Sequence, residues 1–389
     1  MGRVALLSIA ALALAAEPAR AADGGRDFAA EARMFYRVVA CAGDDPVPAG
    51  FDAAVVDAHC KLLAAPKTRF AERYAAPARE FLAALEPPGL PTTVVYPFGG
   101  GDLVSALITY PAATEITTIS LEHPGDPTRL ASLDKKRLQA QLALFRDTIR
   151  GLLMNNDSAS ENMRKMEKGP IPGQLAFFVT GLAILGFEPV GLKFFRLDDA
   201  GAIVYLTDAD VAALAPKKAK KKHGGWVDTD YSEAFTNMEL SFRKRGDAAA
   251  PVVVHRHFAA NLGDPAFKGS PLEKHLAAKG KVVAMTKAAS YLLWLAPFSG
   301  IRDYLLGHMV FMVSDSTGIP PRFARKAGFK QTTYGNFTGS YLPAADIDNQ
   351  AFIQLWESQK VRRLPFRYGY PDVAGNVHMM ITRSAEATP

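Results

Sequence analysis

The chain has 389 residues, of which 49% are hydrophobic and 22% are charged, and its formal net charge is +6. This composition is typical of a globular protein with a substantial core and excludes wholesale disorder. Five of the positive charges lie in KKAKKKH (217–223), so the charge excess is local and not a property of the whole surface.

The first residues have the features of a secretory signal peptide. Arg3 precedes an apolar run over 4–16, and Ala19-Arg20-Ala21 provides a small-x-small cleavage site. The run is shorter than the roughly 20 residues that cross a bilayer. We expect residues 1–21 to be removed and the mature chain to be secreted or periplasmic, without a transmembrane segment.

Residues 22–90 predict a helical cap, because three segments carry apolar residues at helical spacing. Cys41 and Cys60 are the only cysteines of the chain. In an exported protein such a pair is expected to form a disulfide, which here would join the first helix to the second. A redox or metal-binding pair is the alternative, but the two cysteines lack CxxC spacing.

Residues 91–215 alternate between strand and helix patterns, which predicts a Rossmann-like lobe with a parallel or mixed sheet. The predicted elements are a strand in TTVVYPF (92–98), a helix in GDLVSALITYP (101–111), a strand in TEITTISLEH (114–123), helices over 127–153 and 173–187, and a hairpin around 198–201.

Residues 216–226 form a predicted basic linker, and residues 227–383 a second mixed α/β lobe that precedes a tail over 384–389. The second lobe begins with a strand, a turn and a strand, followed by a helix over 270–280 and a strand from 281. Ser299 is expected to cap a helix over 299–308, and MVFMVSDSTGIPPRF (309–323) is expected to form a strand, a turn and a strand. The lysines of Lys217–Lys222 are either a solvated loop or a contact with an anionic envelope surface. No nucleic-acid partner is expected.

The glycine-rich loop after the first strand is the leading candidate for a binding site. Free backbone amides at the start of a helix can hold an anion or cofactor, and an acidic residue after the next strand can bind ribose hydroxyls. Asp102 stands where it would cap the helix itself and repel a pyrophosphate, so a tight turn is the alternative. The candidate ligand-binding residues are Tyr96, Phe98, Gly99, Gly100, Gly101, Asp102 and Glu122.

The strand, glycine loop and helix within residues 92–123 resemble the first motifs of the class I S-adenosylmethionine-dependent methyltransferases. The resemblance implies a Rossmann-like fold and S-adenosylmethionine or another nucleoside as the cofactor. The chain departs from the family at Pro97, where an acidic residue is expected, and at Leu103, where the last glycine is expected. The resemblance therefore predicts a degenerate cofactor site.

A longer resemblance rests on YPFGGGD…SLEHPG and on FSGIRDYLLGH…DSTGIPPR. These signatures are similar to those of an uncharacterised family of exported bacterial proteins, and the likeness runs through most of the mature chain. The family implies no activity. The polar residues of its second signature are either a structural network or a site; they are Arg302, Asp303, His308, Asp315 and Arg322.

His255 and His257 alternate along a predicted strand, which places both imidazoles on one face at a spacing that zinc sites use. A third ligand would have to come from Asp230, His275 or His308. Two histidines on a solvent-facing side are the alternative, and no metal is expected. The chain also lacks the G-x-S-x-G, H-E-x-x-H and G-x-x-x-x-G-K-[ST] motifs of common enzymes.

These observations favour an exported, degenerate Rossmann-like protein that binds a small ligand or a cell-envelope partner. A transferase or hydrolase that uses the loop at Gly99–Asp102 is the first alternative, and a structural envelope protein is the second. The sequence leaves open whether the chain is an enzyme.

Overall fold

The computed structural model describes residues 24–155, 166, 170–214, 232–342, 346–370 and 376–385. The predicted signal peptide, the linker with Lys217–Lys222 and all but two residues of the predicted tail lie outside the described residues. Within the described part of the chain, none of the helices combines the length and the apolar character that a membrane crossing needs.

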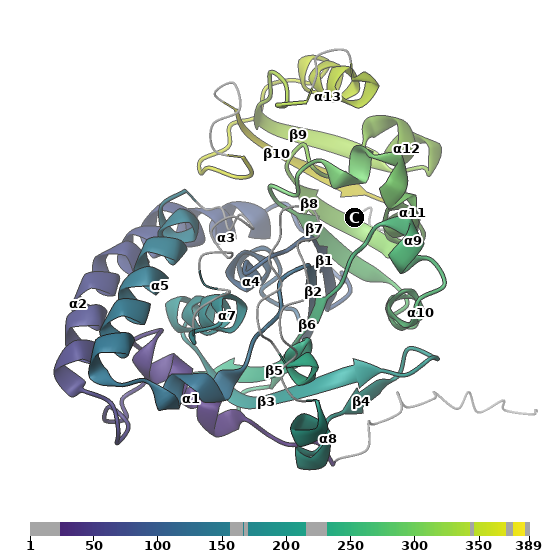
Figure 1. Cartoon of the computed structure of the whole chain (residues 1–389). Coiled ribbons are helices and arrows are strands. Elements are labelled where there is room, and N and C mark those ends of the chain that lie inside the picture. Colours follow the sequence, from purple (N-terminus) through teal and green to yellow (C-terminus); the bar gives the residue numbers. More distant parts are fainter. Residues whose placement is uncertain are drawn as a thin grey trace, which may run out of the picture.

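A group of N-terminal helices flanks the sheet, as the sequence predicts (Figure 1). These helices are α1 (Ala29–Val38), α2 (Ala53–Phe70) and α3 (Ala76–Ala83), and a π-helical turn, η1 (Ala71–Ala75), joins the last two. Asp52 caps α2 by accepting a hydrogen bond from Val55 N. The Cys41–Cys60 disulfide is present and joins the loop after α1 to α2.

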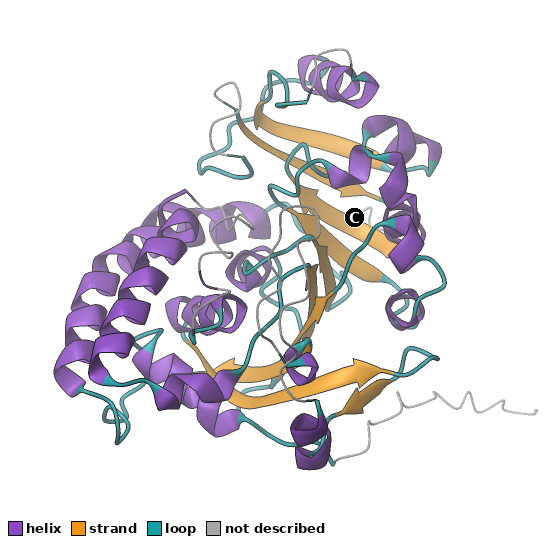
Figure 2. Ribbon diagram, viewed as in Figure 1, coloured by secondary structure: helices purple, strands orange, loops and turns teal. Residues whose placement is uncertain are grey.

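Within the described residues, ten strands form one mixed sheet, whose strands are drawn in orange in Figure 2. Their order is β4-β3-β5-β6-β2-β1-β7-β8-β10-β9. In chain order the strands are β1 (Thr93–Pro97), β2 (Glu115–Ser120), β3 (Phe187–Leu197), β4 (Ile203–Tyr205), β5 (Asn237–Lys244), β6 (Val253–Ala259), β7 (Val282–Thr286), β8 (Met309–Ser314), β9 (Lys330–Asn336) and β10 (Val377–Arg383).

The five central strands, β6-β2-β1-β7-β8, are parallel, and the strands outside them pair antiparallel. The chain moves from β1 through β2 to β6 on one side and then returns to β7 and β8 on the other. This is the doubly wound arrangement, with its switch point between β1 and β7. The predicted α/β class with a mixed sheet is confirmed.

Strands from both predicted lobes meet in this sheet. β6 and β7, from the range 227–383, lie on either side of the β2-β1 pair, from the range 91–215. Parallel neighbours need crossover connections, so strands that are far apart in the sequence can pair side by side. The predicted lobes therefore share a single sheet.

Helices cover both faces of the parallel strands (Figure 1). Those that pack with the N-terminal helices are α4 (Leu103–Thr109), α5 (Lys135–Asn155) and α7 (Gly173–Leu185), and those of the opposite core are α9 (Asp264–Phe267), α10 (Pro271–Ala277), α11 (Ser299–His308) and α12 (Pro321–Lys326). The remaining elements are η2 (Pro127–Ser132), α8 (Asp208–Ala213), η3 (Glu233–Phe235), η4 (Leu292–Trp294), η5 (Ala296–Phe298) and α13 (Ile347–Glu357).

Three local predictions differ from the structure. The helix expected over 127–153 is the 3-10 turn η2 followed by α5. The strand expected after the turn at 315–318 is the helix α12, because Pro321 occupies its first position, where proline favours a helix. Ser299 is the first residue of α11 and not its cap, and its hydroxyl instead donates to Asp264.

Candidate ligand-binding site

The loops after β1 and β7 lie at the switch point of the sheet. In open α/β sheets, ligands bind outside the carboxyl ends of the strands where the strand order reverses. The loop after β1 runs over 98–102 and contains the three glycines, and the loop after β7 runs over 287–291. We call these two segments the switch-point loops.

Strained backbone is concentrated in the switch-point loops. Among the described residues, five that are not glycine have a positive φ, namely Cys41, Phe98, Ala288, Ser290 and Tyr291, with φ between 52° and 59°. Four of the five lie in the switch-point loops. Such conformations cost on the order of 1–3 kcal/mol each and gather at functional sites, where the surrounding structure enforces them.

Side chains from neighbouring loops hold the strained segment after β7. The amide of Ala288 donates to Asp315 Oδ2 over 2.9 Å, that of Ala289 to Thr317 Oγ1 over 3.1 Å, and that of Ser290 to the Tyr370 hydroxyl over 2.8 Å. Asp315 is fully buried. Burial raises the pKa of its carboxyl group, whereas hydrogen bonds from Thr317 and Ala288 and the charge of Lys287 oppose that rise.

The three glycines make a tight turn and a close helix contact. Gly100 has φ +50°, which favours glycine. A Cβ atom on Gly101 would lie 2.5 Å from the ring of Phe177 in α7, so a side chain is excluded there. Gly99 and Gly101 are buried. Backbone conformation therefore accounts for Gly100, and helix packing accounts for Gly101.

Asp102 caps α4, as its position predicts: its Oδ1 accepts a hydrogen bond from Ser105 N over 3.3 Å. Its other oxygen, Oδ2, lies 2.5 Å from Lys287 Nζ and 3.2 Å from the Tyr96 hydroxyl. Sequence reasoning missed Lys287. A lysine directly after the strand pattern VVAMT, which is apolar but for its last residue, Thr286, would have indicated a charge at the carboxyl end of the sheet.

Lys287 lies in a buried network that includes the N-terminal helices. Its ammonium group donates to Ser105 Oγ over 2.6 Å and lies 5.3 Å from the centre of the Tyr74 ring. Tyr74 comes from the π-helical turn η1, and its hydroxyl also donates to Ser105. Burial, and then the charge of Asp102, raise the pKa of Tyr96. These side chains are buried, and they stabilise the switch point from inside the protein.

Glu122 follows β2 and is 4% exposed. Gln174 donates to its Oε2 over 3.5 Å, while its Oε1 has no hydrogen-bond partner among the described residues. The neighbouring Leu121 is 55% exposed. At the end of β1, the partly buried Phe98 packs edge-on against Phe298, with ring centres 5.8 Å apart. In the described part of the chain, the carboxyl edge of the sheet therefore combines apolar surface with buried, unsatisfied polar atoms, among them Glu122 Oε1 and the hydroxyls of Thr286 and Ser314.

His255 and His257 share one face of β6, as predicted, but that face is buried and not solvent-facing. Both rings contact Thr118 Oγ1, at 2.8 and 2.9 Å, and both pack against Phe178 of α7. Burial lowers the pKa of His257 to about 4 and also lowers that of His255. The face is buried because β6 is an interior strand beneath α7.

The other residues weighed as metal ligands are bonded elsewhere or lie outside the described residues. His275 contacts Gly201 O and His308 contacts Gly280 O, each through Nδ1 at 3.0 Å. Asp230 is not among the described residues. In the part of the chain that the structure describes, no group of three or more histidine, cysteine or acidic side chains is arranged to hold a metal ion.

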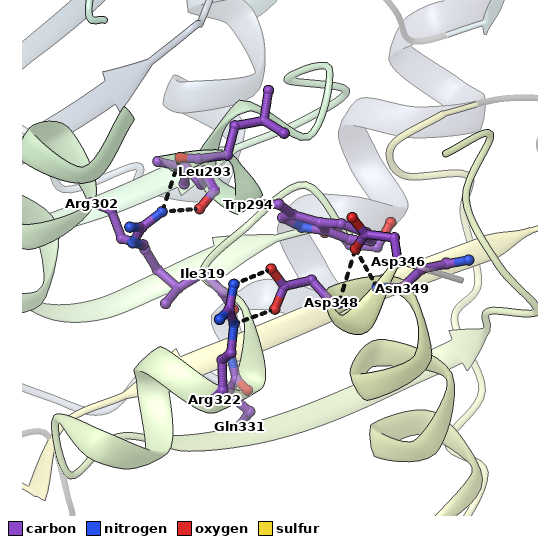
Figure 3. A network of polar contacts seen from close by, with 11 residues as sticks. Leu293, Trp294, Arg302, Ile319, Arg322, Gln331, Asp346, Asp348 and Asn349 are labelled. Atoms are coloured by element: carbon purple, nitrogen blue, oxygen red, sulfur yellow. Dashed lines mark hydrogen bonds and ion pairs between the residues drawn. The ribbon is translucent and has the colours of Figure 1, made fainter. Parts of the chain in front are cut away.

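The polar residues of the second signature occupy different places. Arg302 donates to Leu293 O over 2.8 Å, and Arg322 forms two hydrogen bonds with Asp348, of 2.7 and 2.8 Å (Figure 3). Both guanidinium groups lie over the Phe323 ring, at 4.0 and 4.3 Å. Asp303 is exposed, His308 faces Gly280, and Asp315 supports the strained loop.

Comparisons with known proteins add no assignment to this geometry. No family model matches the chain, and neither the curated proteins nor the solved structures contain a significant match. Because a fold alone does not define a function, the function is inferred from the residues of the site.

Proposed function

We propose that this chain is a Rossmann-like binding protein that holds a small neutral or zwitterionic ligand over the carboxyl ends of β1, β2 and β7. The observation that carries the proposal is the strained backbone at the switch point, with Phe98 on one side and Ala288, Ser290 and Tyr291 on the other. Strain that neighbouring side chains enforce indicates a preorganised surface.

The charges at this edge argue against a phosphate ligand. Asp102 caps α4 and is itself paired with Lys287, so the amides at the start of this seven-residue helix face a carboxylate. The exposed surface nearby is apolar and includes Leu121 and Leu295, at 55% and 39% exposure. A ligand with an apolar part fits these features, and a nucleoside such as S-adenosylmethionine belongs to this class.

A binding role is favoured over catalysis by the buried polar groups. Asp102 and Lys287 have side-chain exposures of only 2% and 1%, and Ser105 is fully buried. A nucleophile or general base must reach its substrate within hydrogen-bond distance. The transferase or hydrolase alternative therefore requires this network to open. The other alternative, a structural envelope protein, would use Lys217–Lys222 for its contact. These residues lie outside the described part of the chain.

A thermal-shift experiment with the full chain tests the proposal. We expect S-adenosylmethionine, adenosine or a neutral sugar to raise the melting temperature, because a ligand at 100 times its Kd adds about 2.7 kcal/mol to the stability. Phe98→Gly should relieve strain, remove the partly buried ring and abolish the shift. Val361→Ala, at a side chain exposed to 80%, is the control and should leave the shift unchanged. Failure of every compound to shift the wild type would contradict a ligand site.

A further inference from the structure

Three tyrosines border the strained loop after β7. Tyr291 and Tyr370 stack with ring centres 5.6 Å apart and an angle of 19° between the rings. Tyr341 packs nearly perpendicular to both, at 5.0 Å from Tyr291 and 5.6 Å from Tyr370. Tyr341 nevertheless remains 55% exposed, whereas Tyr291 is fully buried. The ring of Tyr341 is therefore exposed to solvent, and the rings of Tyr291 and Tyr370 pack against it on the protein side.

Ser290 lies beside these rings and is tied to them by hydrogen bonds. The Tyr370 hydroxyl accepts from the Ser290 amide over 2.8 Å and donates to Ser290 Oγ over 3.2 Å. Burial raises the pKa of Tyr370, which keeps its hydroxyl protonated and able to donate. Ser290 is exposed and adopts φ 53°. Because its Oγ accepts the hydrogen bond from Tyr370, the hydroxyl proton of Ser290 is left available to donate to a ligand.

We infer that Tyr341 and Ser290 form a platform for a neutral saccharide. A sugar ring has a face of C–H groups, which packs on the negative π-face of an aromatic ring, and a rim of hydroxyls, which hydrogen-bond to a serine. This inference rests on the proposed function, since Ser290 belongs to the switch-point loops. It specifies the ligand class and the part of the edge where the ligand is bound.

The arrangement of the rings favours a saccharide over an organic cation. An aromatic cage surrounds a cation with several ring faces, each within about 6 Å of the charge. Here Tyr291 and Tyr370 stack on each other, so each covers one face of the other, and Tyr291 is fully buried. The charged groups of this loop and its support, Lys287 and Asp315, are buried and act on each other, so neither presents an exposed charge to an ionic ligand. Of the cationic, anionic and neutral ligands considered, a neutral ligand that stacks on the exposed Tyr341 ring therefore fits best.

Isothermal titration calorimetry of the full chain with maltotriose, cellotriose and chitotriose tests the platform, with tetramethylammonium as the cationic probe. We expect at least one trisaccharide to bind and tetramethylammonium not to bind. Tyr341→Ala should weaken trisaccharide binding by about tenfold or more, which corresponds to 1.4 kcal/mol. Tyr341→Phe keeps the ring and should bind like the wild type, and Val361→Ala is the control at another exposed apolar residue.

The outcomes separate this inference from the proposed function. Binding of adenosine or S-adenosylmethionine without binding of any trisaccharide overturns the platform and leaves the proposed function standing. The same conclusion follows if a trisaccharide binds equally well to Tyr341→Ala but not to Phe98→Gly. Absence of binding by every compound overturns both. Binding of tetramethylammonium that Tyr341→Ala abolishes would replace the saccharide by a cation.

Discussion

Lys287 Nζ lies 2.5 Å from Asp102 Oδ2, and the two side chains are 1% and 2% exposed. The pair joins the residue that follows β7 to the cap of α4, and thus the two sides of the switch point. Because both charges are removed from water, each needs the other. The pair therefore fixes the distance between the switch-point loops that the proposed ligand would contact.

Breaking this pair should destabilise the protein strongly. Asp102→Asn removes the carboxylate that is paired with the buried ammonium group of Lys287, and we expect a loss of about 3–5 kcal/mol in the free energy of unfolding by urea. In the double variant Asp102→Asn/Lys287→Met the loss should be smaller than the sum of the single losses by about 2 kcal/mol. Asp208→Asn, in an exposed pair with Arg26, is the control and should change stability by less than about 0.5 kcal/mol. Additive effects at positions 102 and 287 would show that the pair is not coupled.

Neighbouring alanines after β7 should respond in opposite directions to glycine. Ala288 has φ 52°, so Ala288→Gly relieves strain and should be neutral or stabilising by up to about 1 kcal/mol. Ala289 is 3% exposed without a positive φ, and Ala289→Gly should cost about 1 kcal/mol. Urea denaturation of both variants measures the contrast. If Ala288→Gly cost as much as Ala289→Gly, strain at this position would be refuted.

The disulfide should stabilise the N-terminal helices against unfolding. Cys41 and Cys60 are 19 residues apart, and a closed loop of this size contributes about 3 kcal/mol in the chain-entropy model. Reduction with dithiothreitol should therefore lower the urea midpoint. A Cys41→Ser/Cys60→Ser variant should unfold at the lower midpoint with or without reductant. An unchanged midpoint on reduction would indicate that the bond does not constrain the unfolded chain.

Stability should fall as the pH is lowered from about 6.5, in part because of His378. Burial lowers the pKa of His378 to about 3 in the folded protein, below the ordinary value near 6.5 of the unfolded chain. Between these values only the unfolded chain binds the proton, so stability is fully present above pH 6.5 and declines by about 1.4 kcal/mol per pH unit below it.

His378→Gln should remove this contribution. The stability of the variant, measured by urea unfolding at pH 7.5, 5.5 and 4.5, should depend on pH less steeply than that of the wild type by about one proton. The difference between the two proteins cancels the titration of the carboxyl groups they share. If the free energy of unfolding depended on pH equally steeply in the variant and the wild type, His378 would not be buried in its neutral form.

Local chemistry allowed part of this structure to be predicted. The strand, glycine turn and helix at 93–109 follow from an apolar run, three glycines and a capping aspartate. Alternation along β6 correctly placed His255 and His257 on one face. Their burial was not predictable from the strand alone, because it depends on α7 and on the position of β6 inside the sheet.

The contacts that define the candidate site join distant segments. Lys287 and Asp102 meet because β7 pairs with β1, and no local pattern encodes that pairing. The same holds for Tyr341 and Tyr370, which reach the loop after β7 from the region around α13 and from the segment before β10. The strain at Ala288 is likewise invisible in the sequence, since alanine has no preference for a positive φ.

The pairing of β1 with β7 also governs how this chain can fold. Val94 pairs with Val283, roughly 190 residues further along, so the central strand lacks one neighbour until most of the polypeptide is available. Loop closure over such a distance makes folding slow. During synthesis the N-terminal half would therefore persist as an incomplete sheet with an open edge at β1. The sheet is completed late, when β7 pairs with β1. This pairing removes the free edge of β1, to which a strand of another chain could otherwise bind.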